Sequence, residues 1–434
     1  MAIGLRTLYT LVLHLLLPLV AAYLLLRCSR EPGYCRGWRQ RLGGGPGHAG
    51  AGPTGRPLWV HAASVGEVRA AAPLIRGLRQ RYPECEVLIT TTTPTGAVQV
   101  AEAFGSGVRH AYLPLDLPWA VSAFLRRWRP RLAVIMEMEF WPNLFHAVRR
   151  HRIPLLLANA RLSAKSAGRY ARLRPLVAAT LRCPDAIAAQ NDDDARRLRA
   201  LGAPEAAITV TGSVKFDQPV PEMAPENGAA LREELGGADR PVWIAASTRE
   251  GEEEQVLAAH EQLRESHPTA LLLLVPRHPQ RFDRVAELCR ERGHALVRRG
   301  GNGVPGPETA VYLGDTMGEL ATLYAAADVA FIGGSLVALG GQNMLEPAAL
   351  GRPVLLGPSD FNFAAIACTL EERGALLRVA DASGLARVVA ELLDDPARRR
   401  RMAQEGQELI RRNRGATERL LEHIANLNTS TEGT

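Results

Sequence analysis

The residue with the most suggestive setting for acid–base chemistry is Glu67. It ends the stretch His61-Ala-Ala-Ser-Val-Gly-Glu67, which follows the short apolar run 57–60 and opens a helical pattern of small and apolar residues. Ser64 is a suitable N-cap, so Glu67 can complete a capping box, Ser64-x-x-Glu67, whose side chains satisfy backbone N–H groups. The alternative is a general base at the mouth of a strand–turn–helix. Nothing within the seven residues decides between the two.

Two further carboxylates, Glu137 and Glu139, follow the apolar run 133–136 and precede a Trp-Pro turn. Alternate side chains of a strand share a face, so we expect both glutamates to point to the same side, away from Met138. Carboxylates at the end of a buried strand are costly to desolvate unless they are paired or used chemically. A catalytic role and a salt-bridged pair are both compatible with this pattern.

Groups that suit phosphate occur in the second half of the chain. The apolar strand pattern 271–276 ends in Pro276-Arg277-His278-Pro279, with Arg281 four residues after Arg277. Guanidinium groups at such an edge bind phosphate or a nucleotide base, or they form structural ion pairs.

A glycine-rich segment follows the strand pattern 328–332. It contains Gly333-Gly334-Ser335, a second Gly-Gly pair and then Asn343-x-x-Glu346, which opens a helix. Backbone N–H groups of such a loop can approach phosphate oxygens at a helix N-terminus, and Glu346 can accept hydrogen bonds from a ribose diol. The P-loop pattern and G-x-G-x-x-G are both absent. We predict a phosphate loop of another kind, with turn chemistry alone as the alternative.

Composition argues against several other classes of protein. The six cysteines are scattered without C-x-x-C, and the eleven histidines form no H-E-x-x-H pattern, so we expect neither a metal site nor a cofactor. The net charge of +7 indicates an anionic partner. Without a long basic run or an RNA-type aromatic motif, we expect no nucleic acid, which leaves a phosphorylated ligand or a lipid surface.

Strand and helix patterns alternate along most of the chain, which predicts two α/β domains with doubly wound parallel sheets. The first set of strand patterns is 58–63, 86–92, 108–113, 131–137, 153–158, 185–189 and 207–211. A second set follows a Pro-rich segment at 216–229. Ligands of open α/β sheets bind at the carboxyl ends of the strands, so a cleft between two such domains is expected. An acid-bearing first domain that faces a nucleotide-type second domain describes the GT-B glycosyltransferase architecture.

The domain boundaries follow from these patterns. We predict a membrane anchor at 1–30, a basic Gly/Pro linker at 31–57, an N-terminal Rossmann-like domain at 58–215, an interdomain linker at 216–240, a C-terminal Rossmann-like domain at 241–426 and a polar tail at 427–434. The final charged segment is most simply one or two long helices with a solvated face.

The N-terminal segment contains twenty residues without a formal charge, between Arg6 and Arg27. A helix of this length covers the hydrocarbon core of a bilayer. A cleaved signal peptide is the alternative, but the run ends in a poor cleavage site, which favours an uncleaved transmembrane helix. Several arginines follow the run and one precedes it, so the body of the protein is predicted on the cytoplasmic face. The same arginines can hold anionic headgroups.

Taken together, these segments resemble the bacterial 3-deoxy-D-manno-octulosonic acid (Kdo) transferases of lipopolysaccharide inner-core synthesis. The likeness covers nearly the whole chain, in order, through WVHAASVGEV, EMEFWPN, ANARLS, GSVKFD, ASTREGEE, VPRHPQRF, GDTMGEL and GGSLVALGGQNMLEPAALGRPVLLGPSDFNF. It implies a GT-B fold, CMP-Kdo as donor, the 6′-hydroxyl of a lipid A precursor as first acceptor, and a bacterial inner membrane location.

The resemblance also implies roles for individual residues. Glu67 corresponds to the expected base, and Glu137 and Lys215 to groups that assist the transition state. The segments that contact CMP fall on Pro276, Arg277, Met317, Gly318, Glu319, Asn343, Met344, Leu345 and Glu346. The chain departs from the family pattern at Ser213, Arg249, Gln342 and Met344.

The sequence therefore predicts a direct, inverting displacement in which Glu67 deprotonates the acceptor hydroxyl. Two alternatives remain open at this stage. One is a GT-B enzyme that uses another nucleotide sugar on a lipid acceptor, and the other is a non-catalytic, membrane-tethered protein that binds a nucleotide sugar. The number of Kdo residues transferred is not encoded in these motifs.

Overall fold

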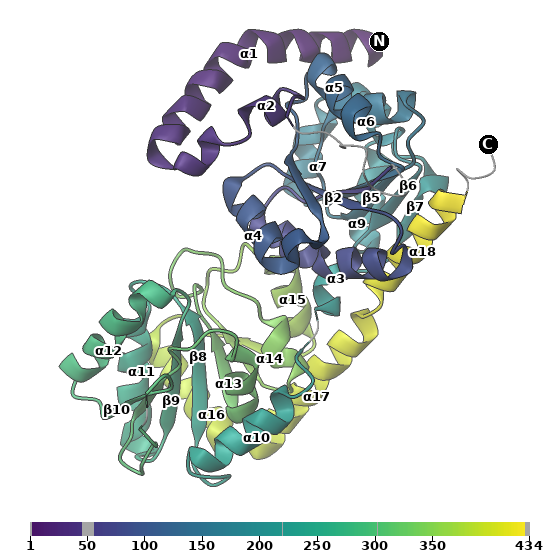
Figure 1. Cartoon of the computed structure of the whole chain (residues 1–434). Coiled ribbons are helices and arrows are strands. Elements are labelled where there is room, and N and C mark those ends of the chain that lie inside the picture. Colours follow the sequence, from purple (N-terminus) through teal and green to yellow (C-terminus); the bar gives the residue numbers. More distant parts are fainter. Residues whose placement is uncertain (1, 46–55, 219, 302, 430–434) are drawn as a thin grey trace. The chain divides into compact units, whose positions relative to one another are not determined.

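The structure, a computed structural model, describes residues 2–45, 56–218, 220–301 and 303–429 (Figure 1). It divides into two compact units. Unit 1 comprises residues 1–218 and 413–434, and unit 2 comprises 219–412. Residues 46–55 of the predicted 31–57 linker and residues 430–434 of the predicted tail lie outside the described residues.

Unit 1 is built on a seven-stranded parallel sheet. Its strands are β1 Leu58–His61, β2 Val87–Thr91, β3 Arg109–Tyr112, β4 Leu132–Met136, β5 Leu155–Ala160, β6 Ala186–Ala189 and β7 Ile208–Val210. They lie in the order β3-β2-β1-β4-β5-β6-β7, so β1 and β4 are neighbours from which the chain winds outward in both directions. Each strand falls on a segment that the sequence predicts as a strand.

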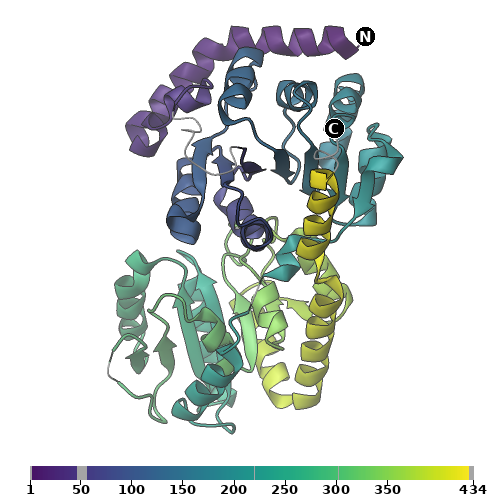
Figure 2. The same ribbon diagram turned by 45° about the vertical axis from the view of Figure 1, so that its right-hand side comes forward.

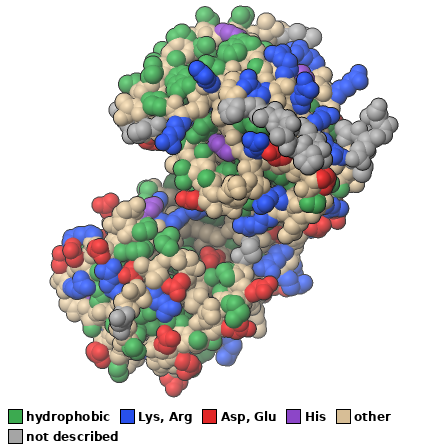
Figure 3. Space-filling view, viewed as in Figure 1, with side chains coloured by type: hydrophobic (Ala, Val, Ile, Leu, Met, Phe, Trp, Pro, Cys, Tyr) green, Lys and Arg blue, Asp and Glu red, His purple; other side chains and the backbone are tan. Residues whose placement is uncertain are grey.

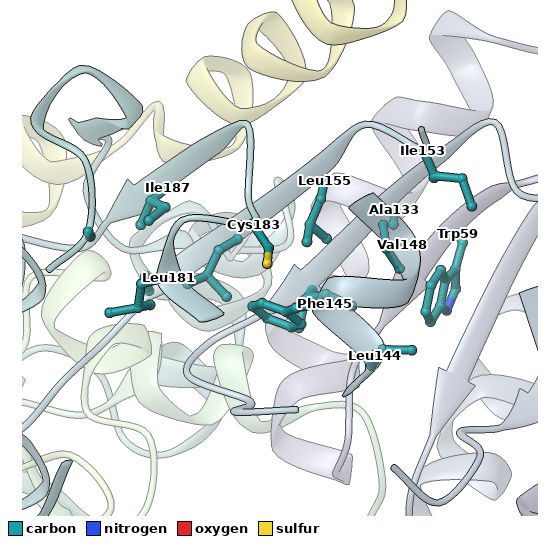
Figure 4. Close-up of a cluster of buried hydrophobic side chains, with 14 of the residues drawn as sticks. Trp59, Ala133, Leu144, Phe145, Val148, Ile153, Leu155, Leu181, Cys183 and Ile187 are labelled. Atoms are coloured by element: carbon teal, nitrogen blue, oxygen red, sulfur yellow. The ribbon is translucent and has the colours of Figure 1, made fainter. Parts of the chain in front are cut away.

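Helices cover both faces of this sheet, as expected for strands that are apolar on both sides. They are α3 Val65–Arg81, α4 Pro94–Phe104, α5 Pro118–Trp128, α6 Pro142–Arg150, α7 Ala164–Ala171, α8 Arg174–Leu181, α9 Asp192–Ala200 and α18 Ala416–Thr429. Figure 4 shows part of the core on one face, where Trp59, Phe145 and Leu155 pack together. On the other face, Val60 and Val134 pack with α3 and α18.

Unit 2 repeats the architecture with a second seven-stranded parallel sheet. Its strands are β8 Val242–Thr248, β9 Leu271–Pro276, β10 Leu296–Arg298, β11 Val311–Leu313, β12 Val329–Ile332, β13 Val354–Leu356 and β14 Leu376–Arg378. The order is β10-β11-β9-β8-β12-β13-β14, with β8 and β12 as the neighbours at which the winding reverses. The predicted fold class, two Rossmann-like domains preceded by an apolar helix, is confirmed.

The helices of unit 2 include one inside the segment that we expected to be a linker. They are α10 Ala224–Glu234, α11 Glu253–Ser266, α12 Phe282–Glu291, α13 Leu320–Ala326, α14 Leu345–Ala349, α15 Ala364–Glu372, α16 Ala382–Asp394 and α17 Pro396–Asn413. Helix α10 has Pro225 in its first turn, where a missing N–H costs little. Gly228 of α10 packs so closely on α13 that a Cβ would lie 2.4 Å from the Ala325 methyl carbon. The buried face of α10 also includes Leu231 and Leu235, but the glycine and the prolines of this segment made it resemble a linker.

The C-terminal helix α18 belongs to unit 1, whereas we expected 241–426 to form the second domain. Leu420, Leu421 and Ile424 are buried in the unit 1 core. Gly77 of α3 makes room for Leu421, because a Cβ at position 77 would lie 2.6 Å from a Leu421 methyl carbon. The charged face of the terminal segment is solvated as predicted, but its apolar positions pack on α3.

The N-terminal helix α1 spans Ala2–Arg30. Its residues Gly4–Ser29 have a mean hydropathy of 2.1 and, apart from the buried Leu24, are exposed or half-buried, so the helix is long and apolar enough to cross a membrane, a property that signal sequences share. Figures 1 and 2 show α1 along the outside of unit 1, and Figure 3 shows hydrophobic side chains along its length. Near its start, Tyr9 donates a hydrogen bond to Asp116 at 3.0 Å, and Thr10 contacts Asn143.

Candidate functional site

The predicted acidic residues meet at the centre of the unit 1 sheet. Strands β1 and β4 lie side by side, and the winding direction of the sheet reverses between them. Glu67 lies in the first turn of α3, directly after β1, and Glu137 and Glu139 directly follow β4. The carboxyl ends of strands at such a reversal are where α/β proteins bind their ligands.

Glu67 makes capping contacts, although not the full capping box. Its backbone N–H donates to Ser64 Oγ at 3.4 Å, which makes Ser64 the N-cap of α3. Its carboxylate accepts the Ala63 N–H at 2.7 Å and the Ser64 hydroxyl at 3.2 Å. These contacts hold the carboxylate in one orientation at the helix N-terminus and leave it partly exposed.

The electrostatic setting of Glu67 suits a group that exchanges protons near neutrality. Burial raises its pKa from 4.5 to about 7. The Ala63 N–H opposes this shift, and the nearby charges of Glu137 and Glu139 reinforce it. A carboxylate with such a pKa can act as a general base at physiological pH. Glu67 therefore combines the hydrogen bonds of a capping residue with the raised pKa that suits a general base.

The backbone around Glu137 differs from the extended strand that we expected. Strand β4 ends at Met136, and Glu137 has a φ of +57°, which few non-glycine residues adopt. Its N–H still donates to the Ala158 carbonyl of β5 at 2.8 Å. Both glutamates lie near enough to Glu67 to raise its pKa, but strand alternation does not place them, because β4 ends before Glu137 and the backbone there is left-handed.

Lys215 joins this acidic cluster from a 3-10 turn, Val214–Asp217. Burial lowers the pKa of the Lys215 ammonium, and the charges of Glu137 and Glu67 oppose that shift, which places the cation near both carboxylates. The turn is held by Asn159, whose Oδ1 accepts the Val214 N–H at 3.2 Å. The structure therefore brings Glu67, Glu137 and Lys215 together, although they lie far apart in the sequence.

Sequence reasoning missed several residues that support this cluster. Asp217 accepts the N–H groups of Gly415 and Thr417 at 2.7 and 2.5 Å and so ties the Lys215 turn to the start of α18. His61, the last residue of β1, is fully buried, and its Nε2 lies 3.8 Å from Glu139 Oε2. A histidine at the end of an apolar run, six residues before a candidate base, was the available signal.

At the equivalent position of unit 2, the structure overturns part of the phosphate-loop prediction. The loop Gly333-Gly334-Ser335 does follow β12, next to β8. However, the fully buried carboxylate of Glu252 accepts the N–H groups of Gly334, Ser335 and Leu336 at 2.6, 3.0 and 2.9 Å. The Arg249 N–H completes this set at 3.2 Å. A side-chain anion thus occupies the donors that we assigned to a phosphate.

The rest of the glycine-rich segment contains hydrogen bonds typical of turns and one carboxyl group, that of Glu346. Gly340 N–H donates to the Ser359 hydroxyl at 2.9 Å, and Gly341 N–H donates to the Gly334 carbonyl at 2.9 Å. Asn343 Oδ1 accepts the Leu345 N–H at 3.1 Å. Burial raises the pKa of Glu346.

Met344 and Leu345 are buried in unit 2, with exposed fractions of 0% and 4%, so in this conformation they offer almost no surface to a ligand.

The remaining predicted donor contacts lie on segments that follow β9 and β11. Arg277 follows Pro276, the last residue of β9, and its N–H donates to the Thr248 carbonyl at 3.0 Å. Arg281, by contrast, is bound to the buried Glu253 through both carboxylate oxygens and has the structural role that we named as its alternative. Within the described part of the chain, no three His, Cys, Asp or Glu side chains form a metal-binding group.

The segment after β11 holds the other three predicted contacts. Met317 is exposed, Gly318 has a φ of +88°, and Glu319 accepts a 3.0 Å hydrogen bond from Arg299. Glu319 is the residue that precedes α13. Their role as donor contacts stays a prediction.

Comparison with known proteins identifies close sequence relatives. Residues 36–218 match a family model described as 3-deoxy-D-manno-octulosonic-acid transferase (kdotransferase). The 3-deoxy-D-manno-octulosonic acid transferase of Haemophilus influenzae is 42% identical over 421 residues, which cover 96% of this chain and 97% of that protein. The enzyme of the same name from Bordetella pertussis is 41% identical over 428 residues, covering 96% and 98%.

The fold is shared with a wider set of solved structures. The UDP-GlcNAc 2-epimerase of Neisseria meningitidis, solved with UDP-GlcNAc, covers 86% of this chain and all of its own, with a TM-score of 0.55 and 15% identity. At this identity the likeness concerns the fold alone, and it supports the GT-B-like architecture.

Proposed function

The chain belongs to the 3-deoxy-D-manno-octulosonic acid transferase family of glycosyltransferases, and from this premise we propose that it transfers Kdo from CMP-Kdo to a lipid A precursor with inversion at the anomeric carbon. The observation that carries the mechanism is the setting of Glu67. Its carboxylate is held by the Ala63 N–H and the Ser64 hydroxyl, and burial raises its pKa to about 7.

In this mechanism Glu67 accepts the proton of the acceptor hydroxyl as the hydroxyl oxygen attacks the anomeric carbon. Lys215 and Glu137 lie beside it, and Lys215 offers a cation to the Kdo carboxylate or to charge that develops in the transition state. The CMP phosphate leaves with its bonding electron pair. A positioned base contributes about 10²–10⁴-fold to such a step.

Unit 2 is proposed to bind the CMP moiety. The residues assigned to this task are Pro276, Arg277, Met317, Gly318, Glu319, Asn343, Met344, Leu345 and Glu346. Because Glu252 already occupies three N–H groups of the glycine loop, the phosphate is assigned to the Arg277 guanidinium and to groups near Asn343. Glu346, a carboxylate, is assigned to the ribose hydroxyls.

Helix α1 is proposed to hold the enzyme on the cytoplasmic face of the inner membrane, where the lipid acceptor lies. The exposed apolar side chains of α1 support this location. Of the arginines that follow the helix, Arg36 and Arg39 are exposed and suit anionic headgroups. Arg41 does not, because it is buried against the Tyr112 ring and donates to the Thr92 carbonyl at 2.9 Å.

The test measures Kdo transfer from CMP-Kdo to a lipid A precursor by mass spectrometry, since the product mass also counts the sugars added. Glu67→Gln is expected to lower turnover by about 10²-fold or more while the protein stays folded. Glu102→Gln, at an exposed glutamate of α4, serves as the control and keeps parental turnover. Near-normal turnover of folded Glu67→Gln would contradict the base assignment.

The donor is tested separately by titration with CMP and with UDP. We expect CMP to bind and UDP to bind at least tenfold more weakly. Arg277→Gln should weaken CMP binding by about tenfold, because one charge-assisted contact to phosphate is lost. Equal affinity for the two nucleotides would show that the donor assignment is wrong.

A further inference from the structure

A buried row of polar groups lies behind the acidic cluster of unit 1. The Trp59 indole N–H donates to Thr90 Oγ1 at 2.8 Å. Thr90 Oγ1 lies 2.9 Å from His61 Nδ1, and His61 Nε2 lies 3.8 Å from Glu139 Oε2. Trp59, Thr90 and His61 are fully buried and come from the adjacent strands β1 and β2. The row therefore runs from the core of the sheet to a carboxylate beside Glu67.

The two ring nitrogens of His61 have different surroundings. Nδ1 lies 2.9 Å from the Thr90 hydroxyl, which accepts the indole proton, and 3.1 Å from the Thr90 carbonyl, so it has a hydrogen-bond partner whether or not it carries a proton. Nε2 has no hydrogen-bond partner among the described residues and faces Glu139. A carboxylate at this distance favours an N–H on Nε2 over a lone pair.

Glu139 receives a second donor from the opposite side of the row. The indole N–H of Trp141 donates to Glu139 Oε2 at 2.8 Å. The Trp141 N–H and the His61 imidazole thus face the same carboxylate oxygen, and both favour the ionised form of Glu139 over the protonated form.

We propose that His61, together with Trp141, holds Glu139 as the permanent anion of the acidic cluster, so that Glu67 is the carboxyl that exchanges its proton. His61 acts through Glu139 and is a positioning residue. The proposal rests on the proposed function, because it explains how one of several neighbouring carboxylates becomes the base. Separating two carboxyls in this way is a general route to a catalytic acid–base assignment.

The other charged groups around the cluster are consistent with this division. Lys215 is affected electrostatically by Glu137 and Glu67, and Arg161 lies near enough to Lys215 to oppose its charge. The Tyr170 hydroxyl interacts electrostatically with the charge of Glu139. The cation of the site therefore stands by Glu67 and Glu137, whereas the described partners of Glu139 are His61 and Trp141.

The titration behaviour of the two carboxyls supports the geometry. Burial raises the pKa of Glu139, but the nearby His61 imidazole and the Trp141 hydrogen bond outweigh it, so the pKa falls below its ordinary value. Burial raises the pKa of Glu67 to about 7, and the charges of Glu137 and Glu139 add to this rise. An ionised Glu139 thus contributes to the proton affinity of Glu67.

The primary test is the pH profile of Kdo transfer by Glu139→Gln. The glutamine oxygen can still accept from Trp141 and face His61, so the shape of the site is kept and only the charge is lost. We expect the apparent pKa of the ascending limb to fall by about 1 unit, which raises the turnover at pH 5.5 relative to pH 8 by up to about tenfold. Glu102→Gln, remote from the cluster in sequence and exposed, should keep the parental profile.

A matched pair of variants tests His61 itself. His61→Asn keeps a polar atom for Thr90 at the position of Nδ1 but has no donor that reaches Glu139, so its profile should shift in the same direction as that of Glu139→Gln. His61→Gln can place an amide N–H at the position of Nε2 and should keep the parental profile. A parental pKa in both Glu139→Gln and His61→Asn overturns the proposal, whether or not turnover falls.

A measurement without substrate separates this inference from the proposed function. Carboxyl ¹³C NMR of the full chain labelled at glutamate Cδ reports the Glu67 titration, with the signal assigned by its absence in Glu67→Gln. A Glu67 pKa that falls in Glu139→Gln supports the inference even if no Kdo transfer is detected, in which case only the proposed function fails. An unchanged Glu67 titration overturns the inference even in an active enzyme.

Discussion

At the scale of single residues, one carboxylate combines two roles that sequence reasoning treats as alternatives. Glu67 accepts the Ala63 N–H and the Ser64 hydroxyl, as a capping residue does, and these bonds fix its position. Burial reduces the exposure of its carboxylate to water and raises its pKa to about 7. Capping therefore orients the proposed base instead of competing with it.

Burial of the Glu67 carboxyl lowers the stability of the folded state by an amount that depends on pH. The folded-state pKa of Glu67 lies above the unfolded value, so between about pH 4.5 and pH 7 the folded state holds a proton that the unfolded chain releases. The free energy of unfolding that protonated Glu67 contributes is fully present at low pH and is lost as the pH rises through 7. We expect Glu67→Gln, which keeps an acceptor for Ala63, to unfold about 5 °C higher than the parent at pH 8 and at the same temperature at pH 4.5.

Thermal unfolding followed by circular dichroism across pH 4.5–8 checks this expectation. Asp116, whose pKa burial also raises to about 7, adds a slope of the same sign in both proteins, so the difference between them isolates Glu67. An identical pH dependence of parent and variant would show that Glu67 ionises in the folded state as it does in the unfolded chain.

The positions of Glu67 and Glu137 were predictable because both follow strand patterns whose carboxyl ends meet in a parallel sheet. The left-handed backbone at Glu137 was not, because only the surrounding fold stabilises that conformation at a non-glycine residue. The carboxylate that binds the glycine-rich loop was not predictable either. Glu252 reaches Gly334 and Leu336 across 82 and 84 residues, a distance over which sequence spacing carries no information.

At the scale of elements, Glu252 connects the two strands between which the unit 2 sheet reverses. It lies just after β8 and binds three N–H groups of the loop after β12. We expect Glu252→Gln to destabilise unit 2 by about 2–3 kcal/mol, because an amide NH₂ would then face buried N–H donors. Denaturant unfolding measures the loss. Glu254→Gln, at an exposed position two residues later, should change stability by less than about 0.5 kcal/mol, and equal effects would contradict the role of the buried anion.

A second connection between elements ties the Lys215 turn to the last helix. Asp217 accepts the Gly415 and Thr417 N–H groups at the start of α18. Asp217→Ala is expected to cost about 1–2 kcal/mol, as the loss of an N-terminal cap does, and to lower turnover because Lys215 loses its fixed position. Glu418→Gln, at an exposed residue of the same helix turn, is the control. Full turnover of Asp217→Ala would separate the turn from catalysis.

At the scale of the whole molecule, the chain leaves unit 1, forms unit 2 and returns to unit 1 with α18. The strands of both sheets were predictable, because most are short apolar runs bounded by turn residues, although β3 Arg109–Tyr112 is not. The return was not, because the terminal segment is dominated by charge and its few apolar positions do not say which core they enter. Helix α1 presents the opposite situation. Its apolar character is plain in the sequence, whereas its contacts with unit 1 through Tyr9 and Thr10 are not.

The exposed surface of α1 should determine where the molecule resides. Leu15 is 78% exposed at the middle of the helix, and Val304 in unit 2 is equally exposed. A charge placed in an apolar membrane contact costs more than one placed in water, so Leu15→Glu should lower partition onto vesicles that contain anionic lipid by about tenfold or more. Val304→Glu adds the same charge and should partition as the parent does. Flotation of the full-length proteins with such vesicles measures the ratio, and equal flotation of the two variants would show that α1 does not form the membrane contact.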